Sequence, residues 1–218
     1  MSAPANGTPR RALDLLITAA SVAVIAWAAV ILLRNRSQES STPTQKDRMV
    51  DRSLVSNGGH ALGPTDAKHV LVVFSDFECP FCKVYSTTID SLATLHPEVR
   101  IVERHFPLTG IHAFALRAAL GAECAGKEGR YWEMRKVLFE RPLVLQSENW
   151  SGLATFAGVH DTAAFTECVK NEQLVDRVRD DMKAATTLAL DRTPTIIVDG
   201  RLYARPPRLA DLEKIFRN

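Results

Sequence analysis

The sequence is poor in several features that mark large classes of proteins. Its four cysteines in 218 residues are too few for a small domain built around disulfides. Its six histidines occur singly, without the spacing of paired ligands on one helix face, so no metal site is predicted. The 27 basic and 25 acidic residues are scattered and form no dense cationic stretch, which argues against nucleic acid as a partner.

One long apolar segment lies near the amino terminus. After a tail over residues 1–12, residues 13–33 (LDLLITAASVAVIAWAAVILL) contain one charge, Asp14. A helix of this length would reach about 30 Å, the thickness of the hydrocarbon core of a membrane. The segment ends at Arg34 rather than at a small-residue cleavage site, so an uncleaved transmembrane anchor is favoured over a cleaved signal peptide. Residues 34–56, rich in Ser, Thr, Gln and charge, are predicted to be a flexible tether.

Residues 57–218 are predicted to form one α/β domain. The apolar run at 70–74 (VLVVF) predicts a strand buried on both faces, and residues 80–95 predict a helix that stops before Pro97. A second strand over residues 99–106 completes a parallel strand, helix, strand unit with a right-handed crossover.

The second half of the domain has a different pattern. Ala- and Leu-rich stretches with helical spacing over residues 112–190 predict an insertion of four or five helices. Residues 195–198 and 201–203, joined by a two-residue Asp-Gly turn, predict an antiparallel hairpin. A final helix is expected over residues 208–216.

Two cysteines, in the sequence Cys79-Pro80-Phe81-Cys82, lie where the first strand ends and the helix begins. Cys79 at the amino end of that helix faces unpaired N–H groups and the positive end of the macrodipole, which favour the thiolate and lower its pKa. Cys82 lies one turn along and can resolve a mixed disulfide formed at Cys79. Pro80 fits the first helical turn, and Phe81 is the apolar residue expected to be exposed beside the reactive sulfur.

The other two cysteines bear on an alternative to redox chemistry. A C-x-x-C pair is also half of a four-cysteine zinc site, but Cys124 and Cys168 are isolated and 44 positions apart. A structural disulfide between Cys124 and Cys168 is favoured, and closing so long a loop would stabilise the fold by about 4 kcal/mol. The alternative is two free buried cysteines, which suits a cytosolic domain.

Three segments resemble one known family. Residues 74–82 (FSDFECPFC) are similar to the active-site segment of the DsbA-like thiol:disulfide oxidoreductases of the thioredoxin superfamily. Residues 193–195 (TPT) resemble the cis-proline loop of that family, and AECA at 122–125 leading into YW at 131–132 resembles its helical insertion. The resemblance implies a thioredoxin-like α/β fold with a helical insertion, over roughly residues 59–216.

The resemblance also implies roles for single residues. Pro194 would be cis and would pack beside the Cys79 sulfur, and the backbone of Thr193 would pair with an extended substrate chain. From the residues alone, a trans proline at the start of a strand is the alternative for Pro194.

Two departures from the family pattern limit what carries over. Thioredoxin has a buried acid six positions before its first cysteine, where this chain has Val73. Asp76 and Glu78 are nearer candidates for a proton relay, with solvated residues near the strand end as the alternative. The Pro-Phe interior of the motif also lacks the histidine of the strongest oxidases, so the redox potential is left open.

The resulting hypothesis is a thiol:disulfide oxidoreductase that needs no cofactor and introduces disulfides into exported proteins through Cys79 and Cys82. Its expected partners are cysteine-containing exported polypeptides and a DsbB-like or vitamin K epoxide reductase-like membrane redox partner. A reductase or isomerase of the same fold is one alternative. A cysteine-ligated metal-binding or interaction module is another.

The orientation in the membrane follows from two opposing signals. Two arginines precede the apolar segment, whereas five basic residues follow it, namely Arg34, Arg36, Lys46, Arg48 and Arg52, a bias that favours a cytosolic domain. Long domains translocate largely regardless of such charges, and disulfide chemistry suits an oxidising compartment. We therefore expect a single-pass protein of the bacterial cell membrane with a periplasmic catalytic domain, and a cytosol-facing domain as the alternative.

Overall fold

The structure is a computed structural model that describes residues 24–31, 46–141, 145, 149–171 and 176–217. The chain divides into two units, Met1–Thr44 and Gln45–Asn218, which we describe separately.

In the first unit, residues 24–31 are helical and exposed, with apolar side chains that include Val24, Ile25 and Trp27. Over the described parts of the chain, no helix is both long enough and apolar enough to cross a membrane. The predicted tail and the remaining residues of the predicted anchor lie outside the described residues.

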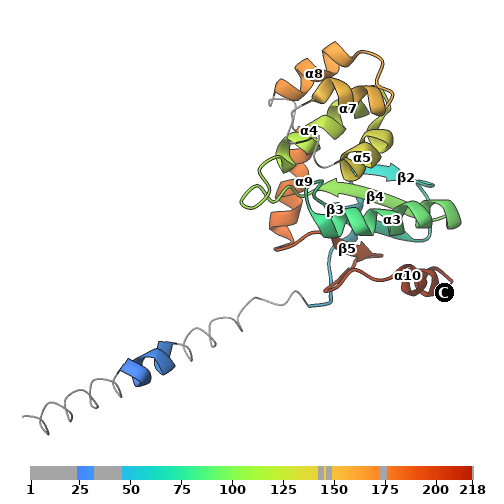
Figure 1. Cartoon of the computed structure of the whole chain (residues 1–218). Coiled ribbons are helices and arrows are strands. Elements are labelled where there is room, and N and C mark those ends of the chain that lie inside the picture. The colour runs from blue at the N-terminus through green and yellow to red at the C-terminus, as the bar shows by residue number, and fades with distance from the viewer. Residues whose placement is uncertain (1–23, 32–45, 142–144, 146–148, 172–175, 218) are drawn as a thin grey trace, which may run out of the picture. The chain divides into compact units, whose positions relative to one another are not determined.

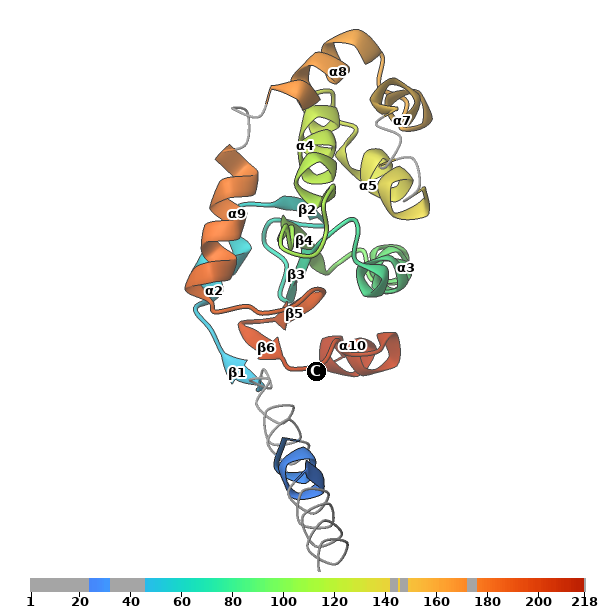
Figure 2. The same cartoon turned by 60° about the vertical axis from the view of Figure 1, so that its left-hand side comes forward.

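The second unit contains a six-stranded sheet with the strand order β1-β6-β5-β3-β4-β2 (Figures 1 and 2). The strands are β1 (Arg48–Met49), β2 (His60–Leu62), β3 (Val70–Ser75), β4 (Arg100–His105), β5 (Thr195–Val198) and β6 (Arg201–Tyr203). β3 pairs in parallel with β4 and antiparallel with β5, and the other neighbours are antiparallel. The predicted parallel unit and the predicted hairpin are both present, and the α/β class is confirmed.

Helices cover both faces of this sheet (Figure 2). α2 (Arg52–Ser56) and α9 (Asp176–Thr187) lie on one face, and α3 (Pro80–Leu95) and α10 (Leu209–Phe216) lie on the other. Alternate side chains of β3 enter two apolar cores. Phe74 joins the core under α2 and α9, whereas Leu71 and Val73 join the core under α3 and α10. The continuous apolar run of β3 is explained by this burial on both faces.

The helical insertion gathers at the β2 end of the sheet (Figures 1 and 2). It contains α4 (Ala115–Gly126), α5 (Tyr131–Glu140), α7 (Trp150–Phe156) and α8 (Thr162–Lys170), after which α9 returns along the sheet. These helices share a third apolar core with Phe77, Cys79 and Cys82. A disulfide between Cys124 and Cys168 joins α4 to α8. The insertion is therefore packed directly against the segment that carries the two other cysteines.

The predicted tether over residues 34–56, and with it the predicted domain start at 57, needs a correction. Residues 46–56 belong to the folded unit, because β1 pairs with β6 and Val55 in α2 is 1% exposed. Arg104 donates a hydrogen bond of 2.7 Å to the carbonyl oxygen of Leu54, which fixes α2 on the sheet. A two-residue edge strand and a five-residue helix are too short to give a hydrophobic period in the sequence.

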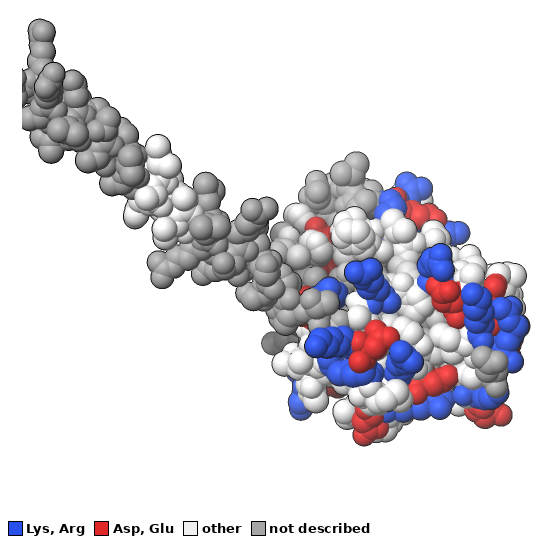
Figure 3. Space-filling model, turned by 90° about the horizontal axis from the view of Figure 1, so that it is seen from below, with Lys and Arg blue, Asp and Glu red and all other residues white. Residues whose placement is uncertain are grey.

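Charged side chains of both signs are interspersed on the face seen in Figure 3. Exposed ion pairs of the second unit include Arg201 with Asp47 and Arg208 with Asp211, each at 3.0 Å. Such exposed pairs contribute little to stability, and they leave no broad surface of one sign on this face.

Candidate active site

The first cysteine of the C-P-F-C motif is the N-cap residue of α3. Its backbone is extended (φ −71°, ψ 119°), and its N–H donates to the carbonyl oxygen of Asp76 at 3.1 Å. Pro80 begins the helix, where no backbone hydrogen bond is lost. No side chain caps the helix at Cys79, so the N–H groups of Phe81 and Cys82 are directed at its sulfur.

The two thiols of the motif are free and have opposite acidity. The pKa of Cys79 falls to about 5, chiefly because the Cys82 thiol donates a hydrogen bond to its sulfur. Burial opposes this shift, and Thr193 and the two helix N–H groups add to it. Burial raises the pKa of Cys82 well above its ordinary value, and the adjacent Cys79 raises it further. At neutral pH, Cys79 is therefore mostly a thiolate, and Cys82 stays protonated.

The loop before β5 lies beside Cys79, although 114 positions separate them. The Thr193–Pro194 peptide bond is cis, and the carbonyl oxygen of Thr193 lies 3.4 Å from the Cys79 sulfur. Thr193, Pro194 and Cys79 all border the same groove. The structure therefore brings together the two sequence segments that resemble the family.

A groove of about 710 Å³ opens at Cys79. Its walls come from the start of α3, the segment between β4 and α4, the cis-proline loop and residues 204–206. The lining is mostly apolar. Two of its lining residues, Phe81 and Ile111, have side chains that are 72% and 75% exposed. The groove offers an extended chain an apolar surface next to the reactive sulfur.

Asp76 and Glu78, the predicted proton relay candidates, anchor the segment between β4 and α4. Asp76 is 2% exposed; its Oδ2 accepts from the Leu108 N–H at 2.8 Å and from His112 Nδ1 at 2.8 Å. Glu78 accepts a hydrogen bond from the Phe114 N–H. Both carboxylates hold the groove wall in place, and the Asp76 backbone N–H reaches the Cys82 sulfur at 3.5 Å.

The sequence did not single out His112, yet it borders the groove together with Cys79. Burial alone would lower its pKa, but the hydrogen bond to Asp76 and the charges of Asp76, Cys79 and Glu78 outweigh burial and raise the pKa. When it is protonated, His112 carries its positive charge at the same groove as the Cys79 thiolate. A single histidine 33 positions after Cys79 carries no sequence signal for this role.

Glu103 is the second residue that the sequence did not reveal. The register of β3 and β4 pairs Glu103 with Val73, the position where thioredoxin has its buried acid. Glu103 is 1% exposed, accepts a hydrogen bond of 2.7 Å from the Ser75 hydroxyl and forms an ion pair with Arg135. It borders a cavity of about 10 Å³ together with Cys82. The buried carboxylate near the resolving cysteine thus comes from the neighbouring strand.

The alternative of a four-cysteine zinc site does not fit this arrangement. Cys124 and Cys168 are bonded to each other, with their sulfurs 2.01 Å apart, so they offer no thiolate ligands.

The comparison with known protein families agrees with this geometry. The sequence model of a family described as “Thioredoxin” matches residues 55–218. The chain belongs to the thioredoxin family. Within it, the DsbA-like recognition from the sequence is confirmed.

Solved structures of this thioredoxin-family group have the same fold. A thioredoxin-like oxidoreductase from Silicibacter pomeroyi is 20% identical with a TM-score of 0.65, and the match covers 77% of this chain and 96% of that one. BdbD from Bacillus subtilis is 22% identical with a TM-score of 0.61, over 79% and 94% of the two chains. DsbA2 from Pseudomonas aeruginosa is 27% identical with a TM-score of 0.51, over 72% and 90%.

Curated proteins that are similar to this chain in sequence are named as antiporters rather than as thioredoxins. Na(+)/H(+) antiporter NhaA 1 of Salinispora arenicola is 34% identical over 144 residues, which are 66% of this chain and 22% of that protein. The protein of the same name from Mycolicibacterium vanbaalenii is 36% identical over 164 residues, 74% of this chain and 26% of that protein. The chain therefore spans about a quarter of the length of these relatives.

Proposed function

We propose that the protein is an oxidase that passes the disulfide between Cys79 and Cys82 to pairs of thiols in exported polypeptides. A substrate thiolate attacks the Cys79 sulfur and forms a mixed disulfide, and Cys82 leaves and takes up a proton. A second substrate thiolate then attacks the substrate sulfur of the mixed disulfide and releases Cys79 as a thiolate. The substrate is oxidised by two electrons and the Cys79–Cys82 pair is reduced by two.

The pKa values of the two thiols are shifted in opposite directions, and this observation supports oxidation of the substrate rather than its reduction. With a pKa of about 5, Cys79 leaves as a stable thiolate, which speeds release of the oxidised substrate. At pH 7, ionisation of such a thiol stabilises the dithiol form by roughly 2.7 kcal/mol relative to a thiol with the ordinary pKa. The same free energy makes the disulfide more oxidising by about 60 mV.

The groove supports an unfolded polypeptide as substrate. Its apolar walls suit side chains that are exposed before folding is complete, and exposed Phe81 and Ile111 extend that surface. The backbone of Thr193, next to Cys79, is suited to pair with an extended chain.

The proposal includes a single-pass anchor over residues 13–33 and a periplasmic catalytic domain. The disulfide between Cys124 and Cys168 supports an oxidising compartment. Reoxidation would then require a membrane redox partner of the DsbB or vitamin K epoxide reductase type. Alkaline phosphatase fused after residue 56 should be active in cells and should fractionate with membranes, and an inactive fusion would support the cytosolic orientation.

Antiport activity is not carried over from the NhaA relatives, because the match spans about a quarter of their length.

Redox titration of the full-length protein against glutathione tests the oxidase proposal. We expect a potential at least about 50 mV above that of thioredoxin, which is about −270 mV. The oxidised protein should also introduce disulfides into a reduced, unfolded polypeptide, and Cys79→Ser should abolish that activity. A potential at or below that of thioredoxin would assign the protein to the reductases instead.

A further inference from the structure

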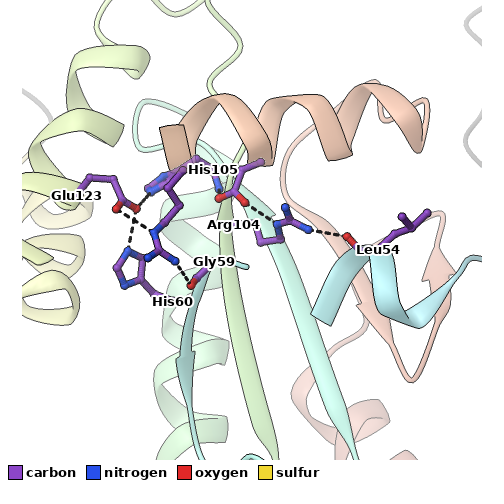
Figure 4. A network of polar contacts seen from close by, with 8 residues as sticks. Leu54, Gly59, His60, Arg104, His105 and Glu123 are labelled. Carbon is purple, nitrogen blue, oxygen red and sulfur yellow. Dashed lines mark hydrogen bonds and ion pairs between the residues drawn. The ribbon is translucent and has the colours of Figure 1, made fainter. Parts of the chain in front are cut away.

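Two histidines and one glutamate from three elements meet where the sheet contacts the helical insertion. His60 lies on β2, His105 at the end of β4 and Glu123 in α4. Figure 4 shows both imidazole rings pointing at the carboxylate. The Nε2 atoms of His60 and His105 lie 2.8 Å and 2.9 Å from the same oxygen, Oε1 of Glu123. The three potential ligand atoms all lie within 4.8 Å of one another.

We propose that His60, His105 and Glu123 form a binding site for a divalent transition-metal ion of the zinc type. Two imidazole nitrogens and one carboxylate oxygen match the ligands of zinc sites that keep a fourth position for water. Calcium and magnesium prefer oxygen ligands alone. An ion at about 2.0–2.1 Å from each atom requires ligand atoms about 3.3 Å apart, so each imidazole nitrogen needs to move about half an ångström away from Oε1 of Glu123.

The neighbours of the cluster fix the orientation of its ligands. The His60 ring stacks on Tyr131, with ring centroids 3.4 Å apart and planes 11° apart. Gly126 leaves room for this stack, because a Cβ at that position would lie 3.2 Å from the His60 ring. The stack holds the Nε2 atom of His60 toward Glu123.

The second oxygen of Glu123 is held by a basic side chain. The Nε atom of Arg177 lies 3.2 Å from Oε2, and the same side chain donates a hydrogen bond of 2.8 Å to the Gly59 carbonyl oxygen. Outer-shell contacts of this kind orient metal-binding carboxylates. Because Arg177 contacts Oε2, it does not occupy Oε1, the oxygen that would bind the ion. Its own side chain is 46% exposed, so water and salt screen its charge.

A metal ion at this site would connect the β2 and β4 strands to α4. The ion would bind the folded chain and not the unfolded chain, because the three ligands come from positions up to 63 residues apart. Its binding free energy would therefore add to the stability of the fold. The spacing of these residues in the sequence gives no sign of a site, since only the fold brings them together.

Titration of the full-length, tag-free protein in mild detergent tests this proposal. Metal is first removed with EDTA, and Cys79 and Cys82 are oxidised, because free thiols would themselves bind zinc. We expect calorimetry with ZnCl₂ to give one ion per chain. His60→Ala and Glu123→Gln should each weaken binding at least about 100-fold. His160→Ala, which changes an exposed histidine elsewhere, should bind like the wild type.

Three further measurements separate ligation from a general loss of structure. Far-UV circular dichroism in EDTA should show that each variant is folded, and CoCl₂ should give visible absorption bands in the wild type and in His160→Ala only. Zinc should raise the unfolding midpoint of the same two proteins. Stoichiometric binding that persists in both cluster variants, or wild-type protein that binds no more zinc than they do, overturns the proposal and leaves a hydrogen-bond network.

Discussion

The Nδ1 atom of His112 donates a 2.8 Å hydrogen bond to the buried Oδ2 of Asp76, at the wall of the groove that Cys79 borders. This contact raises the pKa of His112 and holds its positive form near the reactive sulfur. The same Asp76 oxygen accepts the Leu108 N–H at 2.8 Å, so one carboxylate fixes both the charge and the position of the wall.

Replacing His112 by alanine should raise the pKa of Cys79, because the thiolate loses a nearby cation. The reduction potential should fall by about 20 mV, equivalent to about 1 kcal/mol for one partly solvated charge pair. The measurements are the 240 nm thiolate absorbance against pH and a glutathione redox titration. His160→Ala, a distant and exposed histidine, serves as the matched control. Equal titration curves for wild type and His112→Ala would show that His112 has no electrostatic role.

The hydrogen bond from Cys82 is the largest cause of the low pKa of Cys79, and two variants separate it from the other causes. Cys82→Ala removes the donor and should raise the pKa of Cys79, whereas Cys82→Ser retains a hydroxyl donor and should raise it less. With a substrate that contains a disulfide, the Cys79 thiolate of both variants should attack that bond and remain in a mixed disulfide, because no Cys82 thiol is present to release it. Alkylation rates against pH measure the first effect and non-reducing gels the second. A Cys82→Ala protein that still titrates near pH 5 would assign the shift to the helix N–H groups and Thr193.

The stability of the reduced protein should depend on pH in a way that the oxidised protein does not share. Folded Cys79 has a pKa of about 5, well below that of an unfolded thiol. Between about pH 5 and pH 8 the unfolded chain binds a proton that the folded chain has lost, so stability rises with pH, by up to about 1.4 kcal/mol per unit. Below pH 5 this contribution is lost.

His112 acts in the opposite sense in the same range. Its folded pKa is raised, so its contribution is complete below about pH 6.5 and is lost as the pH rises through the folded pKa. The rise should therefore flatten above pH 6.5. The flattening is measured in the unfolding free energy of the reduced protein, and the Cys79 contribution is measured in its difference from that of the oxidised protein, in which groups that titrate in both states largely cancel. A difference independent of pH would contradict the low pKa of Cys79.

Much of the fold follows from strong local signals in the sequence. The apolar run at 70–74 gives β3, the Asp-Gly turn gives the β5–β6 hairpin, and α3 begins and ends at the predicted residues 80–95. β1, α2 and β2 gave no such signal, because two to five residues are too few to show a period. Their place depends on pairing with β6 and β4 and on packing of Val55, which only the assembled sheet provides.

The residues of the candidate site also fall into two groups, those with a local sequence signal and those without one. Cys79 and Cys82 are close in the sequence and close in the structure, so the motif alone was sufficient to find them. His112 and Glu103 reach the site through a folded loop and through the register of two strands, respectively. The sequence placed Asp76 and Glu78 near the site but could not show that their carboxylates hold the groove wall.

The disulfide between Cys124 and Cys168 should stabilise the protein without taking part in exchange. It links α4 to α8 across 44 positions, and closing a loop of that length in the unfolded chain is worth up to about 4 kcal/mol. The double variant Cys124→Ala, Cys168→Ala should lose a large part of this in denaturant unfolding, compared with the wild type in the same Cys79–Cys82 redox state. Its pKa at Cys79 and its reduction potential should match the wild type, because Cys79 lies at the start of α3, outside the bridged helices. If the potential moved with the stability, the bridge would be coupled to the Cys79–Cys82 pair through the apolar core that they share.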